Sequence, residues 1–122
     1  MEQSVEKIVE RNLLEVFNGR DADSRRQAID ELWDRDSVFI DLGGVHEGIE
    51  KINAIVEVLF TQFKGYVFSV RGPGQSMHCV GCLPWSYGPP DDPQRLTGTD
   101  VGATKDSKLT ALYVFIDSPS QK

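Results

Sequence analysis

The segment TGTDVG, residues 97–102, places an acid between two glycines inside a stretch that otherwise has the composition of a β-strand. Side chains alternate along a strand, so Gly98, Asp100 and Gly102 share one face. Glycine weakens a strand and usually marks a bulge or a close approach by another group. If this face is interior, the two glycines leave empty volume around Asp100, and burial raises the pKa of its carboxyl group.

Two structural interpretations of this segment stay open beside a functional one. The glycines relieve crowding at a bend of the sheet, or Asp100 forms an ion pair with Arg71 or Arg95. Ion pairs also shift pKa values without any catalytic role. A functional interpretation therefore needs a second group placed near Asp100.

A second acid, Asp41, ends the strand-like segment SVFID (37–41), directly before Gly43 and Gly44. The end of an element followed by glycine is a common place for a functional side chain. It is equally common for an aspartate that accepts a hydrogen bond from the backbone of its own turn. His46 follows closely enough to approach the same place, although a loop histidine is more often solvated.

Two aromatic side chains, Trp85 and Tyr87, share a face of the predicted strand 77–87. They line a ligand cavity, or they form an aromatic surface that packs against a second subunit. The same segment carries Cys79 and Cys82 as CVGC. A redox or zinc CxxC normally opens a helix or comes with a second pair of ligands, so we predict two small, partly buried residues and no metal site.

The composition restricts the class of protein. With 122 residues, of which 39% are hydrophobic and 26% charged, the chain is expected to form one globular domain over residues 1–122. The net charge of −6 and the scattered basic residues argue against nucleic acid or an anionic membrane as a partner. No apolar run approaches the ~20 residues of a transmembrane helix, and no leader is recognised, so we expect a cytoplasmic protein.

Hydrophobic periodicity predicts the elements that must position these residues. Apolar residues at helical spacing indicate three helices, over about residues 5–17, 24–33 and 49–63. Trp33 is expected on the buried stripe of the second helix. Period-two segments with turn residues between them predict strands at 37–41, 66–70, 77–87, 95–104 and 109–116. Helices first and strands later indicate an α+β fold with a curved antiparallel sheet and a cavity between the helices and the sheet.

The order of these segments resembles the NTF2-like superfamily, especially its SnoaL-like and ketosteroid-isomerase-like branches. The resemblance covers nearly the whole chain and depends on the segments NGRD, DSVFIDLGG, HEGIEKI, TGTDVG and LYVFID. It implies a conical domain in which three helices pack on a strongly curved, mostly antiparallel sheet. It also implies that the outer face of the sheet often forms a homodimer.

The resemblance to ketosteroid isomerases implies roles for the two acids. Asp41 matches the general base, and Asp100 matches the acid of the oxyanion hole, which in those enzymes stays protonated at pH 7 so that it can donate a hydrogen bond. The tyrosine that those isomerases place in the oxyanion hole falls at Leu13, so one donor is missing unless Asn12 or Tyr87 replaces it. We therefore expect a protein that binds a small hydrophobic molecule, with catalytic residues Asp41 and Asp100 and ligand-binding residues Asn12, His46, Trp85 and Tyr87.

The expected chemistry is proton transfer next to a carbonyl group, as in isomerases and cyclases, without a metal or organic cofactor. A binding module without turnover, or a dimerisation domain of the same fold, is the alternative. The fold alone does not choose between them.

Overall fold

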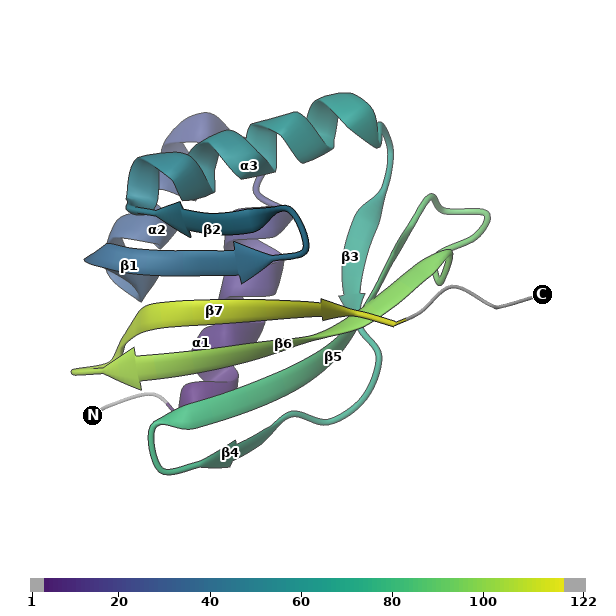
Figure 1. The fold of residues 1–122 in the computed structure, drawn as a ribbon. Coiled ribbons are helices and arrows are strands. Elements are labelled where there is room, and N and C mark those ends of the chain that lie inside the picture. The colour runs from purple at the N-terminus through teal and green to yellow at the C-terminus, as the bar shows by residue number, and fades with distance from the viewer. Residues whose placement is uncertain (1–3, 118–122) are drawn as a thin grey trace.

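The computed structural model of the protein describes residues 4–117 and shows helices covering one side of a single mixed sheet (Figure 1). The helices are α1 (Val5–Arg11), continued by a π-helical segment (Asn12–Phe17), α2 (Ala22–Leu32) and α3 (Ile49–Gln62). The strands are β1 (Trp33–Asp41), β2 (Gly44–Glu47), β3 (Val67–Val70), β4 (Gln75–Met77), β5 (Val80–Gly88), β6 (Leu96–Lys105) and β7 (Lys108–Ile116).

The strands follow the order β2-β1-β7-β6-β5-β3, and β4 pairs with β5 outside this path. The β1–β7 pair is parallel, whereas the other strand pairs of residues 4–117 are antiparallel. α1 lies behind β5, β6 and β7, and β3 runs across the direction of β7 at the far edge (Figure 1). The predicted α+β class, with helices packed on a mostly antiparallel sheet, is confirmed.

The first helical stretch changes its winding where it enters the core. The Ser4 hydroxyl caps α1 by accepting from the Lys7 amide at 3.2 Å. Within the π-helical segment the hydrogen bonds reach one residue further, since the Asn18 amide donates to the Leu13 carbonyl at 3.2 Å. π-helical turns are rare and often occur at functional sites. Here the turn carries Leu13 and Phe17, which both belong to the buried core.

The third helix forms the opposite wall of the core. α3 buries Ile52 and Val56 completely, and it packs against β1, β2 and α2. Gly65 follows the helix with a φ of 81°, a left-handed conformation that glycine adopts without steric cost. α3 and β7 diverge toward the end near β3 (Figure 1).

Three local predictions were wrong. Trp33 is the first residue of β1 and not part of the second helix, since its φ of −116° and ψ of 140° are extended. The predicted strand 77–87 is a hairpin of β4 and β5, because His78 has a φ of 56° and turns the chain. The short strand β2 was not predicted; it pairs with β1 across the turn at Gly43 and Gly44.

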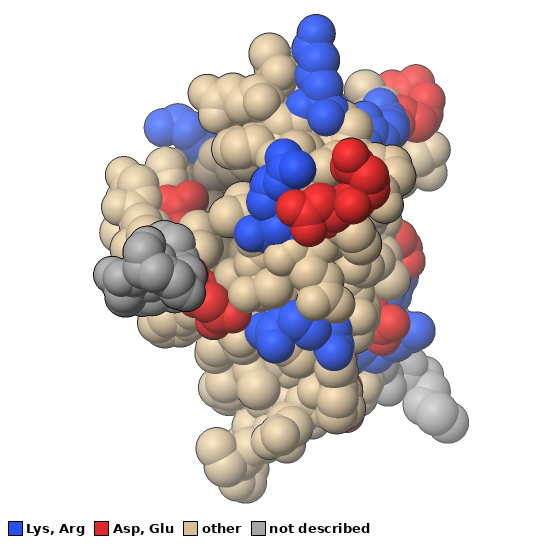
Figure 2. All heavy atoms as spheres, turned by 90° about the vertical axis from the view of Figure 1, so that its right-hand side faces the viewer, with Lys and Arg blue, Asp and Glu red and all other residues tan. Residues whose placement is uncertain are grey.

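Charged side chains of both signs are scattered over the surface. On the face shown in Figure 2, Lys and Arg lie beside Asp and Glu, and no large area of one sign forms there. Ion pairs such as Arg95–Asp92, at 3.0 Å, are part of this pattern. Within residues 4–117, no helix is long and apolar enough to cross a membrane.

Gly102 sets how closely α1 approaches the sheet, and its replacement tests that packing. A Cβ atom at this position would lie 2.8 Å from both Val9 and Leu109 side-chain carbons. Gly102→Ala is expected to lower the free energy of unfolding by about 1–3 kcal/mol, as overpacking of a core does. Urea unfolding measures this change. Gly72→Ala is the control, because its Cβ would meet only Pro84 at 3.4 Å, and an equal loss in both variants would contradict the packing argument.

Candidate functional site

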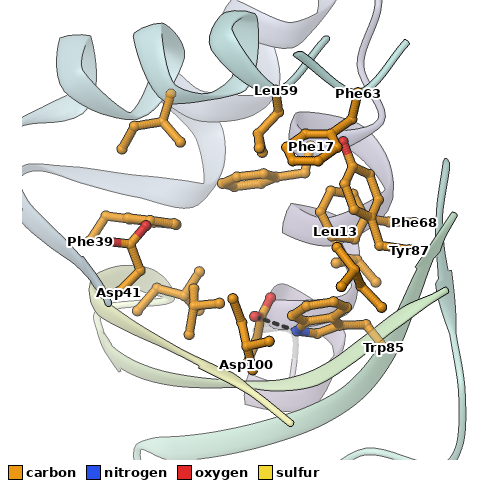
Figure 3. A pocket seen from close by; sticks show the side chains of 15 residues that line it. Leu13, Phe17, Phe39, Asp41, Leu59, Phe63, Phe68, Trp85, Tyr87 and Asp100 are labelled. Atoms are coloured by element: carbon orange, nitrogen blue, oxygen red, sulfur yellow. Dashed lines mark hydrogen bonds between the residues drawn. The ribbon is translucent and has the colours of Figure 1, made fainter. Parts of the chain in front are cut away.

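A mostly apolar cavity of about 180 Å³ lies between the helices and the inner face of the sheet (Figure 3). Its walls come from the π-helical segment, α3 and five of the strands. Two acids and thirteen apolar or aromatic side chains line it: Leu13, Phe17, Phe39, Asp41, Ile55, Leu59, Phe63, Phe68, Trp85, Tyr87, Leu96, Asp100, Leu112, Val114 and Ile116. No basic side chain is among them, so the two acids supply the charge of the site.

Asp100 is the buried acid of this cavity. Its side chain is 4% exposed, and the Trp85 indole donates from Nε1 to Oδ1 at 2.8 Å (Figure 3). Burial away from water raises the pKa of the Asp100 carboxyl to about 7, while the hydrogen bond from Trp85 opposes this rise. Within residues 4–117, Oδ2 has no hydrogen-bond partner. Asp100 therefore presents one oxygen to the cavity and can carry a proton near neutral pH.

Gly98, Asp100 and Gly102 share the buried face of β6, and Asp100 lines the cavity, but the two glycines do not supply the empty volume. A Cβ atom on Gly98 would collide with the Trp85 ring and with the Phe115 carbonyl oxygen. The place beside Gly98 is therefore filled by the indole that binds Asp100, and the cavity lies elsewhere around the carboxyl group. The glycine is needed because Trp85 and Gly98 are directly paired across β5 and β6.

The ion-pair interpretation of Asp100 is also wrong. Arg71 lies 3.5 Å from Asp117, and it donates to the carbonyl oxygens of Trp85 and Gly98 at 3.2 Å each. Arg95 pairs with Asp92 at 3.0 Å. Both arginines are thus engaged elsewhere, and burial remains the dominant influence on the pKa of Asp100.

Asp41 lies at the rim of the same cavity, at the end of β1. Its Oδ1 accepts from the Gly43 amide at 2.9 Å, as the capping interpretation predicted. His46 Nε2 lies 3.3 Å from the same oxygen, and both side chains are 28% exposed. Because Oδ1 is held on the turn side, Oδ2 is the oxygen left for a ligand.

The six residues predicted for the site separate into three groups. Asp41, Asp100, Trp85 and Tyr87 all line the cavity. His46 contacts the cavity indirectly through Asp41, and its ring packs on Phe39 at 6.0 Å between centroids.

Asn12 does not reach the cavity, which corrects its predicted place beside a ligand. It is completely buried, and its Oδ1 accepts from the Trp33 indole at 2.8 Å. Its amide Nδ2, the group that could donate, is buried without a hydrogen-bond partner among residues 4–117, but Asn12 is not part of the cavity lining and so is not placed to replace the missing oxyanion donor.

Tyr87 stands at the other end of the cavity from Asp100. Its hydroxyl points toward Phe63 and away from Asp100 (Figure 3), and the rings of Tyr87 and Phe63 meet at 5.9 Å between centroids. Burial raises the pKa of Tyr87 to about 12, so the hydroxyl keeps its proton. Tyr87 and Asp100 consequently do not share one oxygen site.

The sequence interpretation missed the aromatic wall of the cavity. Phe17 stacks on Phe39 at 5.6 Å, and Phe68 stacks on Tyr87 at 3.9 Å and meets Trp85 edge-on at 5.4 Å. These phenylalanines occupy the apolar faces of their elements, where a core residue and a cavity residue have the same pattern. Their inward position was predictable, but the void between them was not.

Metal-binding side chains do not gather in the described part of the chain. Among residues 4–117, no three His, Cys, Asp or Glu side chains come together. Cys79 is exposed in the turn between β4 and β5, and Cys82 is half-buried on β5. The two thiols are free, and Cys79 is more exposed than the sequence predicted.

Several solved structures have a fold similar to that of this chain. The structure is similar to a candidate isomerase of the SnoaL-like family from Agrobacterium tumefaciens, with a TM-score of 0.85 and 22% identity over 95% of this chain and 100% of that one. A candidate SnoaL-like polyketide cyclase from Jannaschia matches with a TM-score of 0.77 and 18% identity over 96% and 91% of the two chains. No family model and no curated protein sequence matches the chain.

A third similar structure is a hypothetical protein with a ketosteroid-isomerase-like fold from Catenulispora acidiphila, in complex with trimethylamine. Its TM-score is 0.71, with 12% identity over 89% of this chain and 84% of that one. The predicted resemblance to NTF2-like, SnoaL-like and ketosteroid-isomerase-like proteins is therefore confirmed. At these identities the likeness shows the fold.

The raised pKa of Asp100 predicts a pH-dependent stability. The folded chain keeps this proton up to about pH 7, whereas an unfolded aspartate releases it near pH 4. Between these values the folded chain binds more protons, so the free energy of unfolding falls as pH rises and levels off above about pH 7. The full loss is on the order of 4 kcal/mol.

Asp100→Asn removes this proton and tests the effect. The variant is expected to gain stability relative to wild type by up to about 4 kcal/mol as pH rises from about 4 to 8, measured by urea unfolding. A difference that stays constant over this range would show that the Asp100 carboxyl does not titrate within it.

Proposed function

We propose that the cavity binds a small hydrophobic carbonyl compound and moves a proton at the carbon next to the carbonyl group. Asp41 Oδ2 takes the proton from that carbon, and the protonated Asp100 donates a hydrogen bond from Oδ2 to the developing enolate oxygen. The observation that carries this proposal is the different surroundings of two acids on one apolar cavity. One is half-exposed and held by a turn, and the other is buried beside an indole.

General acid–base chemistry explains why Asp41 would act as the base and Asp100 as the hydrogen-bond donor. A base needs a free oxygen within reach of the proton that it takes, and Asp41 lines the cavity with only its other oxygen held by Gly43. A donor to an enolate must keep its proton near neutral pH, and burial gives Asp100 that property. The apolar walls exclude water, which strengthens the hydrogen bond to the charge that forms.

The likeness to a candidate isomerase and a candidate polyketide cyclase supports this reaction class. Leu13 limits the rate of the proposed reaction, because the position that matches the tyrosine of the isomerases carries no hydrogen-bond donor. One donor instead of two costs on the order of 10²–10³ in rate. Binding without turnover is for this reason the second candidate function.

Proton exchange at carbon tests the proposal without a known substrate. Wild type is incubated with a panel of enolisable ketones in D₂O, and the loss of α-proton signals is followed by NMR. Asp41→Asn is expected to slow the exchange by about 10²–10⁴ and Asp100→Asn by about 10²–10³. Asp36→Asn is the matched control, since Asp36 is an exposed acid on the same strand.

Two outcomes separate the candidate functions. Ketone binding that Asp100→Asn weakens, without exchange in the wild type, would support the binding module. An exchange rate that Asp41→Asn leaves unchanged would contradict the role of Asp41 as base.

A second copy of the chain is the proposed partner for the outer face of the sheet. Tyr113 and Phe115 of β7 point away from the core and are 40% and 60% exposed. Val101 of β6 lies directly opposite Tyr113 and is half-buried. Aromatic and aliphatic side chains without a charge among them are typical of the centre of a protein interface.

Phe115→Glu tests this association. The variant is expected to be monomeric at concentrations where the wild type sediments as a dimer, because a charge would be buried without a partner. Analytical ultracentrifugation measures the mass. Leu42→Glu is the control, since Leu42 is 88% exposed in the turn between β1 and β2. A monomeric wild type would contradict the dimer.

A further inference from the structure

The cavity is small. Its volume of about 180 Å³ is close to that of an engineered cavity of about 150 Å³ that binds benzene. Pockets for drug-sized ligands measure about 300–1,000 Å³. The space inside the cavity therefore fits one six-membered ring with short substituents, and several fused rings would extend beyond it.

Contacts among the five side chains of the aromatic wall fix the size of the cavity. These side chains are Phe17, Phe39, Phe68, Trp85 and Tyr87. Phe17 stacks on Phe39 and meets Phe68 edge-on at 6.0 Å between centroids. Phe68 in turn contacts both Trp85 and Tyr87. Each of these five side chains is at least nine-tenths buried, so none can turn outward without breaking contacts with its neighbours.

Two residues of the π-helical segment close the side opposite the sheet. Leu13 and Phe17 are 2% and 6% exposed, and both line the cavity. Figure 3 shows them between α3 and Trp85. Removing part of one of these side chains should therefore enlarge the cavity directly.

The charges of the wall restrict the ligand further. Asp41 and Asp100 are the charged groups of the lining, and no Lys, Arg or His belongs to it. A carboxylate or phosphate ligand would meet two acids and no cation, which is strongly unfavourable in an apolar site. The free Oδ2 of Asp100 instead suits one uncharged oxygen that accepts a hydrogen bond.

We propose that the ligand is a neutral, single-ring compound with one ketone, enol or phenol oxygen, held by Asp100 in a cavity whose length Leu13 and Phe17 limit. This substrate class rests on the proposed function for the role of Asp100. It excludes compounds with several fused rings as ligands of the unmodified protein.

Three phenols with the same oxygen and different numbers of rings test the size limit. Phenol, 2-naphthol and 17β-estradiol have one, two and four rings, and isothermal titration calorimetry measures their dissociation constants at neutral pH. Phenol is expected to bind, 2-naphthol to bind about tenfold more weakly or worse, and 17β-estradiol not to bind. Benzoate, a single ring with a carboxylate, is expected not to bind.

The opposite order of affinities among the three phenols would overturn the proposal. Burial of more apolar surface favours larger ligands wherever space allows, so a cavity without this limit would bind 17β-estradiol most tightly. Tight binding of 17β-estradiol, or no binding of phenol, would each exclude the single-ring class. These measurements use the unmodified protein, so they do not depend on a variant that folds.

A pair of leucine variants locates the limit. Leu13→Ala is expected to improve 2-naphthol binding by about tenfold, because it removes wall atoms from the cavity. Leu32→Ala is the matched control, since Leu32 is equally buried but does not line the cavity. An equal improvement in both variants would show that loosened packing, and not cavity length, changes the affinity.

Proton exchange in D₂O distinguishes a failure of this class from a failure of the proposed function. Cyclohexanone and the two-ring ketone 2-decalone are compared in the wild type and in Asp41→Asn. If the α-protons of 2-decalone exchange as fast as those of cyclohexanone, the size limit is wrong and the proposed proton transfer is retained. If phenol binds more tightly than 2-naphthol and 17β-estradiol but neither ketone exchanges its α-protons, the single-ring class is retained and the proposed proton transfer is rejected.

Discussion

The hydrogen bond from the Trp85 indole to Asp100 is the interaction on which the site depends. It is the one hydrogen bond that the residues described, 4–117, make to the Asp100 carboxyl group, and it leaves the second oxygen free. A buried carboxyl without further partners costs stability, which the protein reduces by keeping the proton. Gly98 makes the contact possible, because any side chain there would occupy the place of the indole.

The cavity and the buried acid both oppose folding, so the rest of the core must offset them. The aromatic wall and the fully buried side chains of α3 supply this packing on one side. On the other side, α1 lies directly on Gly102, where the absence of a Cβ lets the helix approach the sheet. The π-helical turn between these regions carries Leu13 and Phe17 into the cavity. Leu13 and Phe17 thus belong both to the buried core and to the lining of the cavity.

Structures of similar fold are named as candidate isomerases and cyclases, yet the fold accommodates many chemistries. What distinguishes this chain is the content of its cavity. Leu13 contributes bulk where a donor would give a second hydrogen bond, and Tyr87 directs its hydroxyl to the opposite end. Of the side chains that line the cavity, Asp100 is therefore the one that can donate a hydrogen bond to an oxygen at its end.

The sequence by itself determined the α+β class, the inward face of β6 and the two acids, because periodicity and glycine placement depend on local geometry. It left open whether Trp85 and Tyr87 of β5 line a cavity or form an outer surface, and the structure places both on the cavity. Only the tertiary structure decided that the indole of Trp85 binds Asp100, that Asn12 is held by Trp33, and that Arg71 and Arg95 pair elsewhere. These partners come from separate elements, and a residue that lines a void has the same pattern as one that fills a core. The cavity and its size follow from how those elements pack, which no local pattern records.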